Sequence, residues 1–161
     1  MLSPNMLKRM MMTSDAKTLV IEKRVRAPIE KVFEAWTTAS QLIAWWGPDD
    51  VVCIGATIDL RVGGHYRIGN QLADGQVIWI SGTYEDITPP NRLVFSWSID
   101  QGAPSTERVT VNLQSSGDGT ATQITVTHER IPDIKARERH AVGWTGCLDG
   151  LEVWANRTGK G

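Results

Sequence analysis

The chain has 161 residues, of which 41% are apolar and 22% are charged, and its formal net charge at pH 7 is −1. This length suits one domain with its own core, and the near-neutral charge creates no field that would attract nucleic acid or an anionic membrane surface. No apolar stretch reaches the length of a transmembrane helix. We therefore expect a soluble protein with no nucleic-acid and no membrane partner.

The N-terminal residues and the two cysteines indicate the cellular compartment of the protein. Residues 1–16 are rich in methionine but contain no apolar run of signal-peptide length, so we expect a disordered leader before a single domain over 17–161. Cys53 and Cys147 form no C-x-x-C motif. We expect both thiols to be reduced and buried in a cytoplasmic protein.

In chain order, the first element is a strand over 18–26, which its β-branched residues predict. Pro28 then precedes apolar residues that recur every three or four positions over 29–36, the spacing of one face of a helix. A second short helix carries the apolar residues of 42–46 and stops at Gly47-Pro48.

From Val51 onward the apolar residues alternate with polar ones, which indicates strands that each bury one face. Turn residues rich in glycine and proline separate them. The predicted strands lie near 51–61, 64–70, 76–87, 92–100, 107–115 and 121–129. Short connections between consecutive strands predict antiparallel pairing.

Helical spacing returns over 133–156. Three glycines, Gly143, Gly146 and Gly150, interrupt this helix, and each weakens it by roughly 1 kcal/mol relative to alanine. Close approach to the sheet, or space for a ligand beside the helix, would explain them.

The element order predicts an α+β protein with a helix-grip fold. A seven-stranded curved antiparallel sheet would surround a long C-terminal helix, with two short helices after the first strand. One helix cannot fill the trough of such a sheet. We therefore expect an apolar cavity between the concave face and the helices.

Short motifs with a recognisable order run through residues 19–154. They are Ala27-Pro28 with Val32-Phe33-Glu34-Ala35-Trp36, Trp45-Trp46-Gly47-Pro48, Asp59-Leu60-Arg61-Val62-Gly63-Gly64, Gly82-Thr83-Tyr84-Glu85-Asp86-Ile87, Pro90-Asn91-Arg92-Leu93-Val94-Phe95-Ser96-Trp97, Thr127-His128, and His140 with Gly143-Trp144 and Leu148. Together they resemble the SRPBCC (START-like, helix-grip) superfamily and, within it, the family named after the activator of heat-shock protein 90 ATPase. This resemblance implies the helix-grip fold. Its superfamily includes lipid carriers, hormone receptors and aromatic cyclases.

The aromatic composition points to the same interior. Seven tryptophans stand against two phenylalanines and two tyrosines, and large rings with one polar edge suit a wide, partly filled space. Core packing would explain them equally well. The candidate ligand-binding residues are Trp36, Trp45, Trp46, Tyr66, Phe95, Trp97, His128, His140 and Trp144.

The histidines could orient a ligand, exchange protons or simply pack. His128 shares a strand face with Ile124 and Val126, and His140 lies on the apolar stripe of the last helix. With His65 they show no metal-ligand spacing, so we expect no metal site. Asp59 and Arg61, predicted to share a strand face, form either a surface ion pair or an anchor for an anionic ligand.

Nothing in the sequence indicates a phosphate-binding glycine motif or a nucleophilic serine elbow, so we expect no cofactor. Three functions stay open. The first is binding of a small hydrophobic or aromatic ligand. The second is an enzyme of cyclase or hydrolase type that uses a cavity histidine or arginine. The third, implied by the resemblance, is co-chaperone-like stimulation of a heat-shock protein ATPase, with a chaperone as partner. The chain could act as a monomer or a homodimer.

Overall fold

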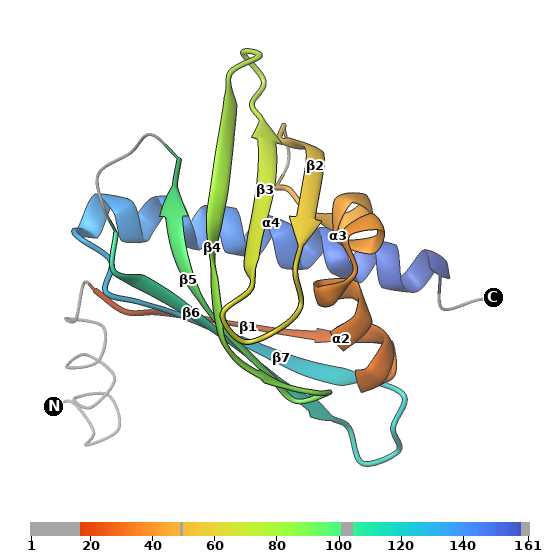
Figure 1. The fold of residues 1–161 in the computed structure, drawn as a ribbon. Coiled ribbons are helices and arrows are strands. Elements are labelled where there is room, and N and C mark those ends of the chain that lie inside the picture. The colour runs from red at the N-terminus through yellow and green to blue at the C-terminus, as the bar shows by residue number, and fades with distance from the viewer. Residues whose placement is uncertain (1–16, 49, 101–104, 159–161) are drawn as a thin grey trace, which may run out of the picture.

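The first and last strands of the chain lie side by side in the computed structural model, which describes residues 17–48, 50–100 and 105–158. A single antiparallel sheet has seven strands in the order β1-β7-β6-β5-β4-β3-β2. The strands are β1 (Leu19–Val25), β2 (Val52–Ile58), β3 (His65–Gln71), β4 (Val77–Thr88), β5 (Arg92–Ile99), β6 (Glu107–Ser115) and β7 (Thr122–Glu129). The sheet curls so strongly that β2, β3 and β4 run across the direction of β1 and β7 (Figure 1).

Two short helices, α2 (Ile29–Thr37) and α3 (Ala39–Trp45), connect β1 to β2. Pro28 precedes α2, where its missing N–H leaves no helical hydrogen bond unmade. Gly47 follows α3 with a φ of 119°, and a Cβ there would lie 2.7 Å from the carbonyl oxygen of Val51. The chain can therefore turn from α3 into β2 only with glycine at this position.

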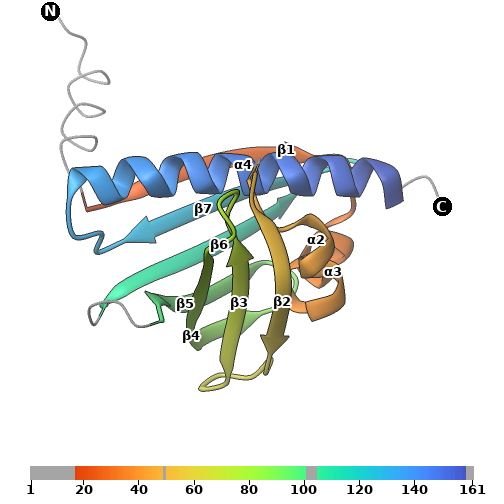
Figure 2. The same ribbon diagram turned by 90° about the horizontal axis from the view of Figure 1, so that it is seen from above.

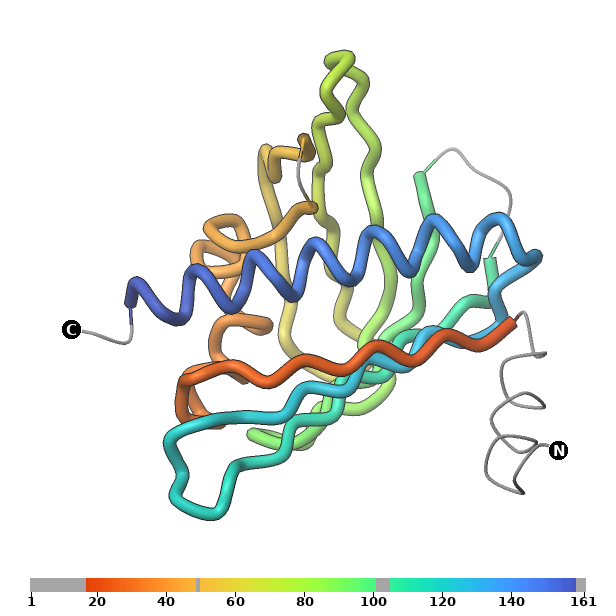
Figure 3. The backbone as a smooth tube through the Cα atoms, turned by 180° about the vertical axis from the view of Figure 1, so that it is seen from behind, coloured from red at the N-terminus to blue at the C-terminus, as the bar shows by residue number. Residues whose placement is uncertain are grey.

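The long helix α4 (Ile134–Thr158) lies across the concave face of the sheet, as the two turned views show (Figures 2 and 3). It buries one stripe of side chains, made of Ala136, Trp144, Cys147, Leu148, Leu151 and Ala155. These side chains meet the inward face of the sheet, where β7 alternates buried and half-buried residues along its whole length. The predicted α+β helix-grip architecture is thereby confirmed.

The clearest departure from the predicted elements is at the end of β2. This strand stops at Ile58, because the segment from Asp59 to Gly64 forms a turn in which Gly64 N donates to Arg61 O at 2.8 Å. Asp59 and Arg61 therefore do not share a strand face. Instead, Arg61 Nε donates to Asp59 Oδ2 at 2.8 Å across the exposed turn.

Three further predictions concern the chain as a whole. The expected leader, residues 1–16, lies outside the described residues. Within the described residues, no helix combines the length and apolar character needed to cross a membrane. Cys53 and Cys147 are both free and buried.

Candidate functional site

The centre of the domain is filled by tryptophan rings contributed by four parts of the fold. Trp36 comes from α2, Trp45 and Trp46 from the end of α3, Trp97 from β5 and Trp144 from α4. Neighbouring ring centroids lie between 4.9 Å, for Trp36 and Trp45, and 6.4 Å, for Trp46 and Trp97. These rings lie where the sequence pattern predicted an apolar cavity between the sheet and the helices.

A void of only about 20 Å³ remains beside this cluster, which is room for about one water molecule. Its lining includes four of the candidate residues, Trp36, Trp46, Tyr66 and Phe95. The hydroxyl of Tyr66 donates to the carbonyl oxygen of Ser96 at 2.6 Å, so its polar end is already paired. The small void is therefore part of the packed core and does not have the size of a ligand site.

A larger cleft opens on the other side of the cluster, between the first half of α4 and strands β3, β4 and β5. Its volume is about 310 Å³. The lining is mostly apolar and consists of Trp46, Pro48, Val51, Asn70, Leu72, Ile78, Ile80, Trp97, Ile99, Arg139, His140, Gly143, Trp144 and Cys147. Four of the candidate residues, Trp46, Trp97, His140 and Trp144, thus line the cleft, whereas Trp45 and His128 line neither space.

The glycines of α4 separate into two kinds. A Cβ on Gly146 would overlap the side chain of Pro48, and a Cβ on Gly150 would lie 2.7 Å from the carbonyl oxygen of Trp45. These two glycines let α4 approach α3 and the chain that follows it, and not the sheet as the sequence suggested. Gly143 differs, because a Cβ there would meet no heavy atom within 4 Å, and this glycine lines the cleft.

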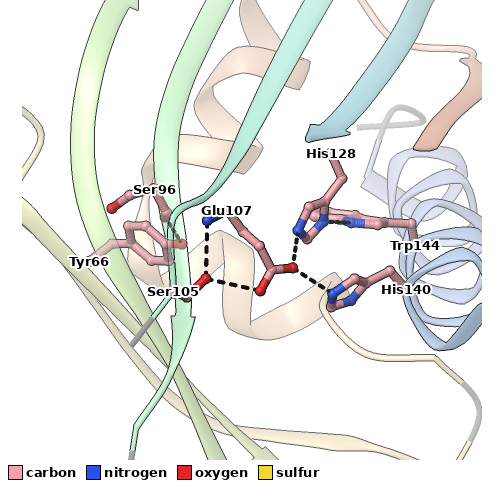
Figure 4. Close-up of polar contacts among 7 residues, drawn as sticks. All are labelled: Tyr66, Ser96, Ser105, Glu107, His128, His140 and Trp144. Carbon is pink, nitrogen blue, oxygen red and sulfur yellow. Dashed lines mark hydrogen bonds and ion pairs between the residues drawn. The ribbon is translucent and has the colours of Figure 1, made fainter. Parts of the chain in front are cut away.

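Glu107 joins the two histidines His128 and His140 (Figure 4), of which His140 lines the cleft. Its Oε1 lies 3.0 Å from Nε2 of His128 and 2.9 Å from Nε2 of His140. Ser105 completes the shell by donating its hydroxyl to Oε2 of Glu107 at 3.0 Å. The imidazole rings are stacked with their centroids 4.2 Å apart.

Strand register explains why these residues meet. Trp97 on β5 stands opposite Glu107 on β6, and Val109 stands opposite His128 on β7. Residues two apart on a strand share a face, so Glu107 points inward like Val109. His140 reaches the same point from the first half of α4.

The indole of Trp144 determines where His128 holds its proton. Trp144 Nε1 lies 3.0 Å from His128 Nδ1, and an indole N–H can only donate a hydrogen bond. Nδ1 of His128 is therefore the acceptor, and its Nε2 carries the hydrogen that is donated to Glu107. Burial, which disfavours the charged ring, lowers the pKa of His128 and keeps it neutral.

Glu107 is ionised although it is largely buried. Burial alone would raise its pKa, but hydrogen bonds from His128, His140 and Ser105 outweigh that effect and lower the pKa to about 2. An ionised carboxylate only accepts hydrogen bonds. His140 must therefore hold a proton on Nε2, and in its neutral form the free lone pair is on Nδ1, which makes no hydrogen bond to any described residue.

The same cluster could be considered as a metal site, since ligand atoms of Glu107, His128 and His140 all lie within 4.8 Å of one another. A metal on Nε2 of His128 would require the proton to move to Nδ1. That proton would then face the N–H of Trp144, so two donors would oppose each other, whereas a metal-bound histidine normally donates its second N–H to an acceptor. The hydrogen bonds favour a proton-holding cluster, and the absence of a metal stays a prediction.

Sequence reasoning missed Glu107. The available signal was its position two and four residues before Val109 and Val111, on the face that these residues bury. A charged residue in that register points toward the core. His65, by contrast, is exposed on β3, where its Nδ1 lies 3.1 Å from the hydroxyl of Thr83 and far along the sheet from the cluster.

Among the residues described, the cleft offers no activated nucleophile. Cys147 lines it, but burial raises the pKa of this thiol to about 12, which leaves it protonated at neutral pH. Burial likewise raises the pKa of Cys53. The chemistry that the cleft can supply is apolar contact together with hydrogen bonding and proton exchange at His140.

Comparison with known proteins places this geometry in a wider group. Residues 26–156 match the family model described as Activator of Hsp90 ATPase homolog 1-like protein. Among solved structures, protein CV1439 from Chromobacterium violaceum is 27% identical, with a TM-score of 0.77 over 85% of this chain and 95% of that chain. PFC0360w, an HSP90 activator from Plasmodium falciparum, is also 27% identical, with a TM-score of 0.64 over 85% of this chain and 94% of that chain.

A third structure shares the fold at lower identity. The AHSA1 protein (SPO3351) from Silicibacter pomeroyi is 22% identical, with a TM-score of 0.74 over 84% of this chain and 95% of that chain. No curated protein shows a significant match to the sequence.

Proposed function

The chain belongs to the Activator of Hsp90 ATPase homolog 1-like family, as its motifs suggested, and we propose that it binds a small, largely apolar molecule in the cleft beside α4. Small-molecule sites are concave, mostly apolar and roughly 300–1,000 Å³ in volume. The cleft, at about 310 Å³, has the size for a ligand of one or two rings. A surface depression of about 600 Å³ between α2 and the end of α4 suits such a ligand less, because charged and polar side chains dominate its lining.

Gly143 is the observation that carries this proposal. A glycine inside a helix costs about 1 kcal/mol relative to alanine, and neither Gly146 nor Gly150 could be replaced without a collision. At Gly143 a side chain would fit, so packing does not account for the glycine. Space for a bound molecule does account for it.

Calorimetric titration with naphthalene derivatives that carry a carboxylate, a carboxamide or an amine tests the proposal. We expect at least one of these probes to bind, and a ligand at 100 times its Kd stabilises the fold by about 2.7 kcal/mol. Gly143→Leu should fill the cleft and abolish binding without lowering stability. Val142→Leu is the matched control, since Val142 is 72% exposed on the adjacent position of α4 and should leave binding unchanged. No binding of any probe, or equal binding to Gly143→Leu, would contradict the proposal.

A second candidate is stimulation of an Hsp90 ATPase, which the likeness to the Plasmodium falciparum HSP90 activator favours. The proposal of ligand binding does not require it. An ATPase assay with an Hsp90 homologue from the source organism separates the two, because Gly143→Leu should remove ligand binding and leave any ATPase stimulation intact. The free thiols of Cys53 and Cys147 support a cytoplasmic location for either role.

An enzymatic role of cyclase or hydrolase type is the remaining alternative. In the described cleft it would depend on proton exchange at His140, since the thiol of Cys147 stays protonated. Arg61 is not available for it, because this side chain lies in the exposed turn after β2, outside the lining of the cleft.

A further inference from the structure

The polar side chains of the cleft differ in whether their hydrogen-bonding atoms already have partners in the protein. Asn70 is fully engaged, because its Oδ1 accepts from Nε1 of Trp46 at 2.8 Å while its Nδ2 donates to the carbonyl oxygens of Ile68 and Ile78, each at 3.2 Å. His140 keeps Nδ1 free, and the preceding residue of α4, Arg139, is an exposed cation. A ligand therefore meets one imidazole and one guanidinium among apolar walls.

The surroundings of His140 place one negative charge against its ring, at Nε2. Glu107 from β6 supplies a carboxylate 2.9 Å from Nε2 of His140. His128 from β7 stacks on the ring but is neutral, and from β5 only the uncharged ring of Trp97 reaches it, with centroids 6.0 Å apart. No cation other than Arg139 lines the described cleft, and Glu107 contacts His140 only at Nε2, so an anionic group in the cleft would lie near Nδ1 of His140 and Arg139.

We propose, on the premise that the cleft binds a small apolar molecule, that its ligand carries one acidic group and binds as the anion against Nδ1 of His140, which takes up a proton on binding. The new N–H bond forms at Nδ1, with the proton coming from solvent when the ligand is already ionised and from the ligand's own acidic O–H when it is not. The result is an imidazolium between two carboxylate-like anions, Glu107 and the ligand, with Arg139 at the rim. The ligand is thus an aromatic or aliphatic acid with one or two rings.

The charge arrangement explains why other ligands would bind less well. A hydrogen bond in which the donor or the acceptor is ionised is about twice as strong as one between neutral groups. A carboxamide of the same shape would make only the neutral bond to Nδ1. An amine would bring a second positive charge beside Arg139.

Proton-linked calorimetry tests the inference. At pH 8, where an ordinary imidazole is neutral, naphthalene-2-carboxylate is titrated into the full chain in phosphate and in Tris, whose ionisation enthalpies differ. We expect about one proton to be taken up per carboxylate bound and none with naphthalene-2-carboxamide. The carboxylate should bind about tenfold more tightly than the amide at pH 7, and its affinity should fall by about tenfold per pH unit on the alkaline side.

Two variants assign the proton. His140→Gln should abolish proton uptake while the carboxamide still binds, which also shows that the variant is folded. Arg139→Gln should weaken carboxylate binding without changing the uptake of about one proton. Equal affinity for the two probes without proton uptake, or unchanged uptake in His140→Gln, would overturn the inference and leave the proposed function standing. Binding of neither probe would contradict the proposed function itself.

Discussion

Nε1 of Trp144 donates to Nδ1 of His128 across 3.0 Å, inside a core where His128 has no exposed surface. This one hydrogen bond joins α4 to β7 and makes Nδ1 of His128 an acceptor. His128 then donates to Glu107, and Glu107 accepts from His140. Because the ionised carboxylate of Glu107 only accepts hydrogen bonds, His140 donates to it through Nε2, and its Nδ1 is the nitrogen that faces a ligand.

Removing this donor tests the relationship. Trp144→Phe keeps an aromatic ring but leaves a buried acceptor on His128 unpaired, which costs about 1–3 kcal/mol in addition to the lost ring atoms. The hydrogen should stay on Nε2, because the ionised carboxylate of Glu107 still accepts it, and ¹⁵N chemical shifts of the histidine ring report its position. Trp97→Phe is the matched control, because Nε1 of Trp97 is buried without a partner among the described residues. Equal destabilisation by the two substitutions would show that the hydrogen bond contributes nothing.

Acid stability tests the state of Glu107. Its pKa is about 2 in the folded protein, below the ordinary value of 4.5. A carboxyl whose folded pKa is depressed stabilises the fold above its unfolded pKa, and this contribution is lost as the pH falls from about 4.5 through about 2. Glu107→Gln should therefore lose less stability than the wild type between pH 4.5 and 2, as measured by urea unfolding at a series of pH values.

Protonation of His128 affects stability at higher pH than protonation of Glu107, so the two contributions can be separated. Its pKa is lowered from 6.5 by burial, so the unfolded chain takes up this proton first as the pH falls. Stability is then lost below about pH 6.5 in both proteins, before Glu107 begins to titrate. Parallel loss of stability in the wild type and Glu107→Gln throughout the pH range would contradict the ionised state assigned to Glu107.

The strands could be predicted because their signal is local. Ile124, Val126 and His128 alternate with polar residues, and this pattern alone places the histidine on the inward face where it is buried. The predicted end of the strand that forms β2 was wrong, because Asp59 and Arg61 also alternate with apolar residues. The turn there depends on hydrogen bonds to β3 and β4, such as Gly63 N to Tyr84 O at 2.8 Å, which local alternation does not reveal.

The site was less accessible to sequence reasoning because it depends on distant contacts. His128 comes from β7, His140 from α4 and Glu107 from β6, and their polar atoms lie within 4.8 Å of one another only in the folded chain. The position of the cleft depends on how five tryptophan rings share the centre, with Trp46 and Trp144 in contact at 5.6 Å between centroids. A count of tryptophans indicates a large aromatic interior, but it cannot tell which part of that interior stays open.

Replacing Arg61 should change neither the stability nor the ligand affinity by much. Its ion pair with Asp59 is exposed on both sides, with 73% and 51% of the side chains accessible, and such pairs contribute about 0.2–1 kcal/mol at most. Arg61→Ala should therefore shift the free energy of unfolding by no more than about 0.5 kcal/mol and leave the affinity for naphthalene-2-carboxylate unchanged. A large loss of carboxylate affinity would mean that Arg61, and not the cleft, anchors the anion.

Alanine substitutions at two glycines of α4 should have opposite effects, although the two positions are only three residues apart. Gly143→Ala adds a methyl group to open space and removes the helical penalty of glycine, so it should stabilise the fold by up to about 1 kcal/mol. Gly146→Ala places the same methyl group against Pro48, and overpacking of this kind costs typically about 1–3 kcal/mol.

Urea unfolding of the two variants beside the wild type measures this contrast, with the slope of the transition checking that the unfolded states are comparable. Because helix propensity changes equally at both sites, the difference between the two variants reports only what surrounds each Cβ. If Gly143→Ala destabilised the fold as much as Gly146→Ala, the wall of the cleft would be closed at that point. A cleft closed at Gly143 would have no room for the ligand beside α4.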